Sequence, residues 1–183
     1  MKLTGEKIYL KEGLMEKNYP LLLQWFHDVE IMNYIGWVKK GLALKDVQEL
    51  KNFVAKLEDG IIFGIYDHAD KFIGYASLSD FNGKDKYEFG IFILNKDYWG
   101  KGIGLETIEL VLDYAFNQLG VNAVNLSTSE FHTNAIRLYE KAGFRKTGLA
   151  PNDRTIFHNG EWVLSGTVEM EIGKDKAINT NLF

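Results

Sequence analysis

The chain has 183 residues, of which 46% are hydrophobic and 25% are charged, the balance of a globular protein long enough to bury a core. Twenty-one basic and 25 acidic residues give a net charge of −4, so the composition does not favour nucleic-acid binding. The lack of cysteine excludes disulfides, Fe–S clusters, thiolate zinc sites and a covalent acyl-cysteine mechanism.

No part of the sequence looks like a targeting or membrane-spanning segment. Residues 1–6 lack the apolar run of a signal peptide, and no apolar run approaches the ~18 residues that a membrane span needs. We therefore expect a cytoplasmic protein that does not contact a membrane. Because we find no linker, repeat or low-complexity tract, we expect a single domain over residues 1–183.

The first half of the chain shows a short strand pattern, two helix patterns and three β-rich runs. Alternation predicts a strand at residues 7–11, and apolar side chains at helical spacing predict helices at residues 18–35 and 44–58. The β-rich runs are residues 61–66, 72–79 and 87–94. The short polar segments between them are typical of turns, so we expect an antiparallel meander. The third run is apolar on both faces, as in a buried central strand.

The second half alternates helices with strands. Apolar faces predict a helix over residues 102–118 and another over residues 133–142. Three further strands are expected at residues 123–128, 144–148 and 163–172, the last two around a loop that contains Asn159 and Gly160. This order of elements predicts a mixed sheet with helices on both faces.

A glycine cluster, Tyr-Trp-Gly-Lys-Gly-Ile-Gly at residues 98–104, lies between the apolar strand and the first of these helices. Such a turn presents free N–H groups at the positive end of a helix, which is a site for phosphate oxygens. The cluster departs from the Rossmann fingerprint, because residue 105 is leucine, and it lacks the G-K-[ST] end of a Walker motif. A tight turn that binds no ligand is the alternative interpretation.

Two segments carry a resemblance to the GNAT superfamily of N-acetyltransferases. EFGIFILNKDYWGKGIG, residues 88–104, resembles the family's pyrophosphate loop, and NAIRLYEKAGF, residues 134–144, resembles its final helix motif. Trp99 stands at the usual Gln/Arg position, which is similar to the branch that acetylates ribosomal-protein N-termini, and His132 replaces a usual asparagine. The resemblance implies a mixed α/β (α+β) fold with a mostly antiparallel central sheet of about seven strands. About four helices flank this sheet, which splays after the fourth strand.

The resemblance implies acetyl-CoA as the cosubstrate. Its pantetheine would pair with the strand backbone at Phe92, Ile93 and Leu94, and a backbone amide there would stabilise the oxyanion. The diphosphate would lie on the backbone of Trp99, Gly100, Lys101, Gly102, Ile103, Gly104 and Leu105, where Lys101 adds a charge or is simply a solvated lysine. Asn134, two residues after His132, is a further expected contact.

Two side chains are candidates for proton transfer. Tyr139 lies on the inner face of the last predicted helix, and a phenol with a pKa of ~10 is protonated at pH 7 and can donate to a leaving thiolate. Glu88 begins the strand before the glycine cluster, where its carboxylate could take the amine proton directly or through water. A core tyrosine and a solvent-facing glutamate are the alternatives, and His132 is a rival base. No histidine has metal-binding spacing, so we expect no metal.

These features predict an acetyl-CoA-dependent N-acetyltransferase that acts by direct attack in a ternary complex, as a monomer or a homodimer. The branch resemblance favours a protein N-terminus as the amine acceptor. Trp25, Tyr34 and Trp37 flank the first two predicted helices, a region that covers the acceptor in the family. Core positions are the alternative interpretation, and Trp37 is the best candidate for an exposed wall. The alternatives are a small-molecule acceptor (a polyamine, an amino acid or an antibiotic) and a non-catalytic coenzyme A-binding module.

Overall fold

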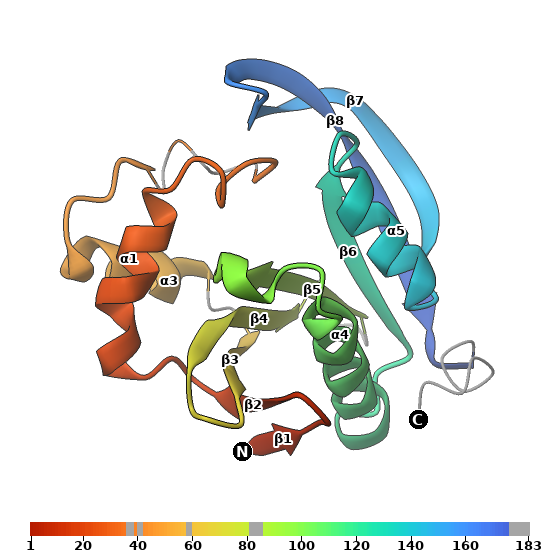
Figure 1. The fold of residues 1–183 in the computed structure, drawn as a ribbon. Coiled ribbons are helices and arrows are strands. Elements are labelled where there is room, and N and C mark those ends of the chain that lie inside the picture. Colours follow the sequence, from red (N-terminus) through yellow and green to blue (C-terminus); the bar gives the residue numbers. More distant parts are fainter. Residues whose placement is uncertain (36–38, 40–41, 58–59, 81–85, 176–183) are drawn as a thin grey trace.

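Figure 1 shows the computed structural model of the chain, which describes residues 1–35, 39, 42–57, 60–80 and 86–175. Its centre is an eight-stranded sheet with the order β1-β2-β3-β4-β5-β6-β8-β7. The strands are β1 (Lys2–Thr4), β2 (Ile8–Glu12), β3 (Gly60–Asp67), β4 (Phe72–Asp80), β5 (Lys86–Ile93), β6 (Ala123–Ser129), β7 (Arg145–His158) and β8 (Glu161–Gly173). The predicted wall residue Trp37 and the predicted turn before residue 86 lie outside the described residues, as does the predicted helix end at residue 58.

The sheet is mixed and mostly antiparallel, as the sequence predicts. The β5–β6 pair is parallel, and the other neighbouring pairs are antiparallel, including the predicted meander β3–β4–β5. One strand more is present than the seven expected from the sequence. This is β1, which is three residues long and so too short to show an alternating pattern.

The strands β7 and β8 are longer than predicted. They form one hairpin whose tip is Asn159 and Gly160, with φ angles of 51° and 88°. Two central turn residues with positive φ are typical of a tight hairpin turn, so the long loop predicted after residue 148 is wrong. The β7–β8 register shifts between Ala150 and Arg154, and this irregularity hides the strand's alternation in the sequence.

The helices are α1 (Tyr19–Phe26), α3 (Val47–Leu57), α4 (Ile103–Asp113) and α5 (Thr133–Lys141), and a π-helical turn, Tyr114–Gln118, continues α4. The predicted helix over residues 18–35 therefore ends at Phe26. Asp28 Oδ1 accepts hydrogen bonds from the backbone N–H groups of Glu30 (2.9 Å) and Ile31 (3.3 Å), and such side-chain bonds compete with helical ones. None of the described helices is long and apolar enough to cross a bilayer.

Helices cover both faces of the sheet (Figure 1). On one face, α1 and α3 bury Leu22 and Val54 against Ile62 and Tyr75 in a smaller core. On the other face, α4 and α5 contribute to the main core with side chains that include Ile108, Val111, Leu112 and Tyr139. The predicted arrangement of helices on both faces is therefore confirmed.

The central strands β5 and β6 separate after a short contact. They pair only through the residues from Lys86 to Glu88, which face residues 123–125 of β6. In Figure 1, β6, β8, β7 and α5 lean away from the N-terminal half of the sheet. The sequence predicts strands from β2 onward but not β1, so β5 is the fourth of the predicted strands. The resemblance implies a splay after the fourth strand, and this is where β5 and β6 separate.

Candidate active site

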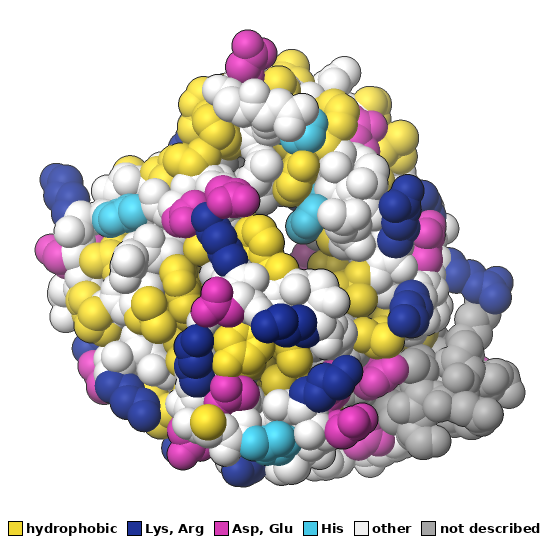
Figure 2. Space-filling model, viewed as in Figure 1, with side chains coloured by type: hydrophobic (Ala, Val, Ile, Leu, Met, Phe, Trp, Pro, Cys, Tyr) yellow, Lys and Arg dark blue, Asp and Glu magenta, His cyan; other side chains and the backbone are white. Residues whose placement is uncertain are grey.

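A cavity of about 1130 Å³ opens where β5 and β6 separate, and residues of both strands line it. It exceeds the roughly 300–1,000 Å³ of sites that hold one drug-sized ligand. Figure 2 shows this face of the molecule hollowed near its centre. All predicted site residues except Lys101 line the cavity: Glu88, Phe92, Ile93, Leu94, Trp99, Gly100, Gly102, Ile103, Gly104, Leu105, Asn134 and Tyr139.

The glycine loop forms one wall of the cavity at the start of α4. Gly100 and Gly102 have φ angles of 71° and 83°, a region that favours glycine, and Gly102 is the N-cap of the helix. The first N–H groups of a helix have no partner within it, so those of the first turn are available to an anion. The Trp99 N–H is not among them, because it donates to Lys96 O at 3.1 Å.

Charged side chains around the glycine loop differ from those expected. The Lys101 ammonium lies 5.8 Å from the centre of the Tyr98 ring, and Lys101 is not among the residues that line the cavity. A Cβ atom on Gly102 would instead lie 3.2 Å from Lys7 Nζ, so Lys7 is the cation that lies beside the helix start. Nothing in the sequence indicates this, because Lys7 is far from the loop along the chain.

At the end of β5, every second residue directs its backbone N–H and C=O groups into the gap where β5 and β6 separate. The Leu94 N–H donates to Ile73 O at 3.0 Å, and a Cβ atom on Gly74 would collide with Phe92 O at 1.9 Å, so these two backbone groups face β4. Because backbone groups alternate in direction along a strand, those of Ile91 and Ile93 face the cavity. Of the three residues predicted to contact pantetheine, only Ile93 therefore directs its backbone into the cavity, and its carbonyl oxygen accepts from the Trp99 indole at 2.7 Å. Ile91, which was not predicted, directs its backbone the same way.

Tyr139 and Glu88 reach the same cavity from opposite halves of the molecule. Tyr139, on α5, is 8% exposed, and burial raises the pKa of its phenol, which is therefore protonated at neutral pH. No described residue hydrogen-bonds its hydroxyl. Glu88 lies in the last β5–β6 pair before the splay, and Ser127 Oγ donates to its carboxylate at 3.4 Å. The structure thus brings both candidate proton-transfer groups together.

His132 is poorly suited to act as the rival base. Its ring stacks on Tyr34 with 4.6 Å between ring centres, and burial lowers the pKa of His132 to about 4. A neutral imidazole with so low a pKa has little tendency to take a proton from an ammonium group. Asn134, at the start of α5, is exposed at the cavity edge.

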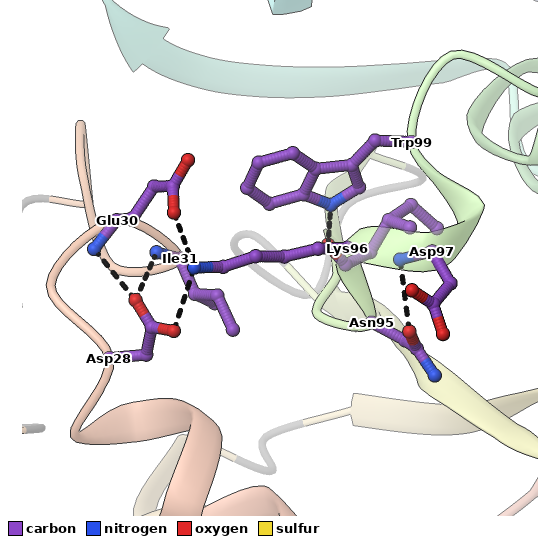
Figure 3. Close-up of polar contacts among 8 residues, drawn as sticks. Asp28, Glu30, Ile31, Asn95, Lys96, Asp97 and Trp99 are labelled. Carbon is purple, nitrogen blue, oxygen red and sulfur yellow. Dashed lines mark hydrogen bonds and ion pairs between the residues drawn. The ribbon is translucent and has the colours of Figure 1, made fainter.

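The segment after α1 closes the cavity on the α1 side and is attached at two points. Lys96, in the loop after β5, forms ion pairs with Asp28, at 2.8 Å, and with Glu30 (Figure 3). Tyr34 is held in the left-handed region at φ 67° and packs between His132 and His158. Tyr34 lines the cavity, so the predicted acceptor-covering role of this region stays a prediction about one of its walls.

Arg154 is a further lining residue that the sequence did not single out. It lies on β7, and its Nε donates to Thr167 Oγ1 at 2.6 Å, which donates to Asp153 Oδ1 at 2.6 Å. All three residues line the cavity. A single arginine after an interrupted strand pattern carries no recognisable signal, so only the fold identifies it.

Comparison with known proteins agrees with this geometry. Residues 12–145 match the acetyltransferase (GNAT) domain family. The chain is 36% identical over 102 residues to the probable N-acetyltransferase YjcK of Bacillus subtilis, and the alignment covers 55% of each protein. It is 24% identical to the uncharacterized N-acetyltransferase p20 of Bacillus licheniformis, with 80% of this chain and 84% of that one covered. The Vibrio cholerae spermidine N-acetyltransferase bound to CoA and spermine has a TM-score of 0.80 at 24% identity, covering 96% of this chain and 100% of that one.

The splayed sheet and the glycine loop beside the cavity define the fold of a coenzyme A-dependent acyltransferase. The family match covers more than half of the chain, so the protein belongs to the GNAT acetyltransferase family, and it is an N-acetyltransferase with acetyl-CoA as its cosubstrate. None of the three similar proteins is named as an acetyltransferase of ribosomal-protein N-termini, so the match supports the superfamily and does not show that branch.

Proposed function

We propose that this protein transfers the acetyl group of acetyl-CoA to the primary amine of a small molecule, by direct attack in a ternary complex. One observation carries the proposal. A single cavity holds the glycine loop, the edge of β5 that β6 leaves unpaired, and the side chains of Glu88 and Tyr139. Its volume leaves room for a second ligand beside the thioester arm.

The donor is held by backbone groups. Amides from Gly100 to Leu105 bind the diphosphate with the help of the Lys7 charge, and the pantetheine lies along Ile91 and Ile93. An N–H group of β5 that faces the splay stabilises the oxyanion on the thioester carbonyl. The chain has no cysteine to carry an acetyl group, which supports direct transfer.

The proton transfers use two side chains that line the same cavity. The neutral amine nitrogen attacks the thioester carbon, and the C–S bond breaks as the tetrahedral intermediate collapses. The Glu88 carboxylate takes the proton that the amine loses, directly or through water, and the Tyr139 phenol gives a proton to the departing thiolate.

A small acceptor fits a cavity bordered by the segment after α1 better than a protein N-terminus does. The segment after α1 is attached to both neighbouring walls, through Lys96 on one side and through the Tyr34–His132 stack on the other. A polypeptide would need an open groove across this segment. That the Vibrio cholerae protein binds spermine, a small amine, supports the same choice.

The test is release of the free coenzyme A thiol from acetyl-CoA in the presence of a panel of small amines and short peptides. We expect release with at least one small amine, and no release when Glu88→Gln and Tyr139→Phe are combined. Turnover of peptides alone would contradict the small-molecule acceptor. Binding of coenzyme A without turnover of any amine or peptide would identify a non-catalytic module.

A further inference from the structure

One side chain in the cavity has a charge that the acetyl-transfer steps do not use. Among the described lining residues, Arg154 is the only lysine or arginine. Its side chain is half-buried, and burial lowers the pKa of the Arg154 guanidinium. A charge in such a place is costly unless a partner replaces the water that it has lost. The groups that pair with Arg154 therefore indicate what kind of ligand the cavity binds.

Arg154 is held in a fixed orientation. Its Nε donates to Thr167, which is buried on β8, and Thr167 donates to Asp153, so one edge of the guanidinium is fixed. The terminal NH₂ groups form the other end of this planar group. The register shift of β7 displaces residues 151–153 from regular pairing, and such bulges redirect side chains beside active sites.

The terminal NH₂ groups of Arg154 make no hydrogen bond or ion pair with any described residue. Asp153 accepts from Thr167 instead, and the charge of Glu88 acts on Arg154 from beyond the 4.0 Å of an ion pair. Of the other acidic lining residues, Glu30 is paired with Lys96. The cavity thus presents the terminal NH₂ groups of Arg154 and the carboxylate of Glu88, which act on each other without forming an ion pair.

We propose that Arg154 binds a carboxylate group of the acceptor, and that the acceptor is therefore a small amino acid-like molecule. This inference rests on the proposed acetyltransferase function. A planar guanidinium binds a carboxylate through two parallel hydrogen bonds, and Glu88 faces the amine of the same zwitterion. A polyamine, which is cationic at each nitrogen, would be repelled by Arg154.

The donor does not account for the free edge of Arg154. The coenzyme A phosphates are assigned to the first turn of α4, next to Lys7. Arg154 lies on β7, at the edge of the sheet, and the charges that act on its guanidinium are those of Asp153 and Glu88, neither of which belongs to the glycine loop. Its partner is therefore expected on the acceptor side of the thioester.

Matched pairs of acceptors test the proposal: L-lysine with cadaverine, and L-phenylalanine with phenethylamine, which differ by the carboxylate alone. Thiol release from acetyl-CoA gives kcat/KM for each compound. Since hydrogen bonds to charged groups are strong, we expect kcat/KM to be about tenfold or more higher for the carboxylate-bearing member of at least one pair. Arg154→Gln should remove this preference mainly through KM of the acceptor, and Arg154→Lys should keep part of it.

The exposed Arg145 on the same strand provides the matched control, because Arg145→Gln makes the same charge change outside the cavity. In Arg154→Gln, the KM for acetyl-CoA and the rise in melting temperature with coenzyme A should both be unchanged. These two measurements test whether the variant folds and binds the donor. Equal or better turnover of the decarboxylated amines, or an equal loss for both members of each pair in Arg154→Gln, would overturn the carboxylate site alone. Absence of thiol release with every amine would overturn the proposed function as well.

Discussion

The indole Nε1 of Trp99 donates a hydrogen bond of 2.7 Å to the carbonyl oxygen of Ile93 (Figure 3). This bond joins the glycine loop to the end of β5, which are the two parts of the cavity assigned to the donor. Trp99 is 42% exposed, so its bond to the strand, more than burial, accounts for its position.

Trp99→Phe should loosen this connection while keeping an aromatic ring. Loss of one hydrogen bond costs about 1 kcal/mol, or about 2–4 °C in melting temperature for a chain of this size. The coenzyme A-induced rise in melting temperature should also fall. The comparably exposed Trp162, whose indole makes no hydrogen bond to a described residue, is the control, and an equal effect of Trp162→Phe would contradict the role of the bond.

Gly104→Glu should abolish the stabilisation by coenzyme A, because it places bulk and negative charge in the first turn of α4. A ligand that binds the folded state raises stability by RT ln(1 + [L]/Kd), so thermal melts with and without coenzyme A measure the loss. Gln118→Glu adds the same charge at the other end of the helix and should keep the shift. An unchanged shift in Gly104→Glu would exclude the diphosphate site.

Lys7→Gln should weaken coenzyme A binding several-fold, since Lys7 Nζ lies beside Gly102. The difference from wild type should shrink as salt is raised, because an exposed charge is screened within a Debye length of about 8–10 Å near physiological ionic strength. Titration calorimetry at two salt concentrations measures both effects. Lys17→Gln, at an exposed site outside the cavity lining, is the control.

Tyr139→Phe should keep coenzyme A binding and lose turnover. The phenol hydroxyl has no hydrogen-bond partner among the described residues, so its removal should not lower the melting temperature. Loss of general-acid assistance typically costs ~10²–10⁴-fold in rate. A fall in kcat of less than about threefold would show that Tyr139 serves packing alone.

Glu88→Gln should remove the acid limb of the pH–rate profile, because only an ionised carboxylate can take the proton of the amine. An acceptor whose own amine has a low pKa keeps that amine neutral across the range measured. If both the rate and the acid limb persist in Glu88→Gln with such an acceptor, the base is water.

His132 should make the folded state less stable as the pH falls. The folded protein holds the pKa of His132 at about 4, below the ordinary value of 6.5 that it has when unfolded. Between these two values the unfolded chain takes up a proton that the folded protein does not, so stability is lost from pH 6.5 downward. Melting temperatures at pH 7 and pH 5 should differ less in His132→Phe, which keeps a ring against Tyr34. An equal difference would contradict this role.

The amino-acid sequence by itself determined the features that depend on neighbouring residues. Alternation and helical spacing mark the β3–β4–β5 meander, α4 and α5, since side chains close in sequence decide which face of an element is apolar. The glycine loop is visible for the same reason, because positive φ angles at Gly100 and Gly102 restrict those positions to small residues.

The tertiary structure alone decided what depends on contacts between distant segments. The length of β7 is hidden by the register shift in its pairing with β8. The direction of the Ile91 and Ile93 backbone follows from which edge of β5 is left unpaired. Lys7, beside the glycine loop, and Arg154, in the cavity lining, come from opposite ends of the chain. No local pattern predicts such positions, because only the packed sheet brings those residues to the site.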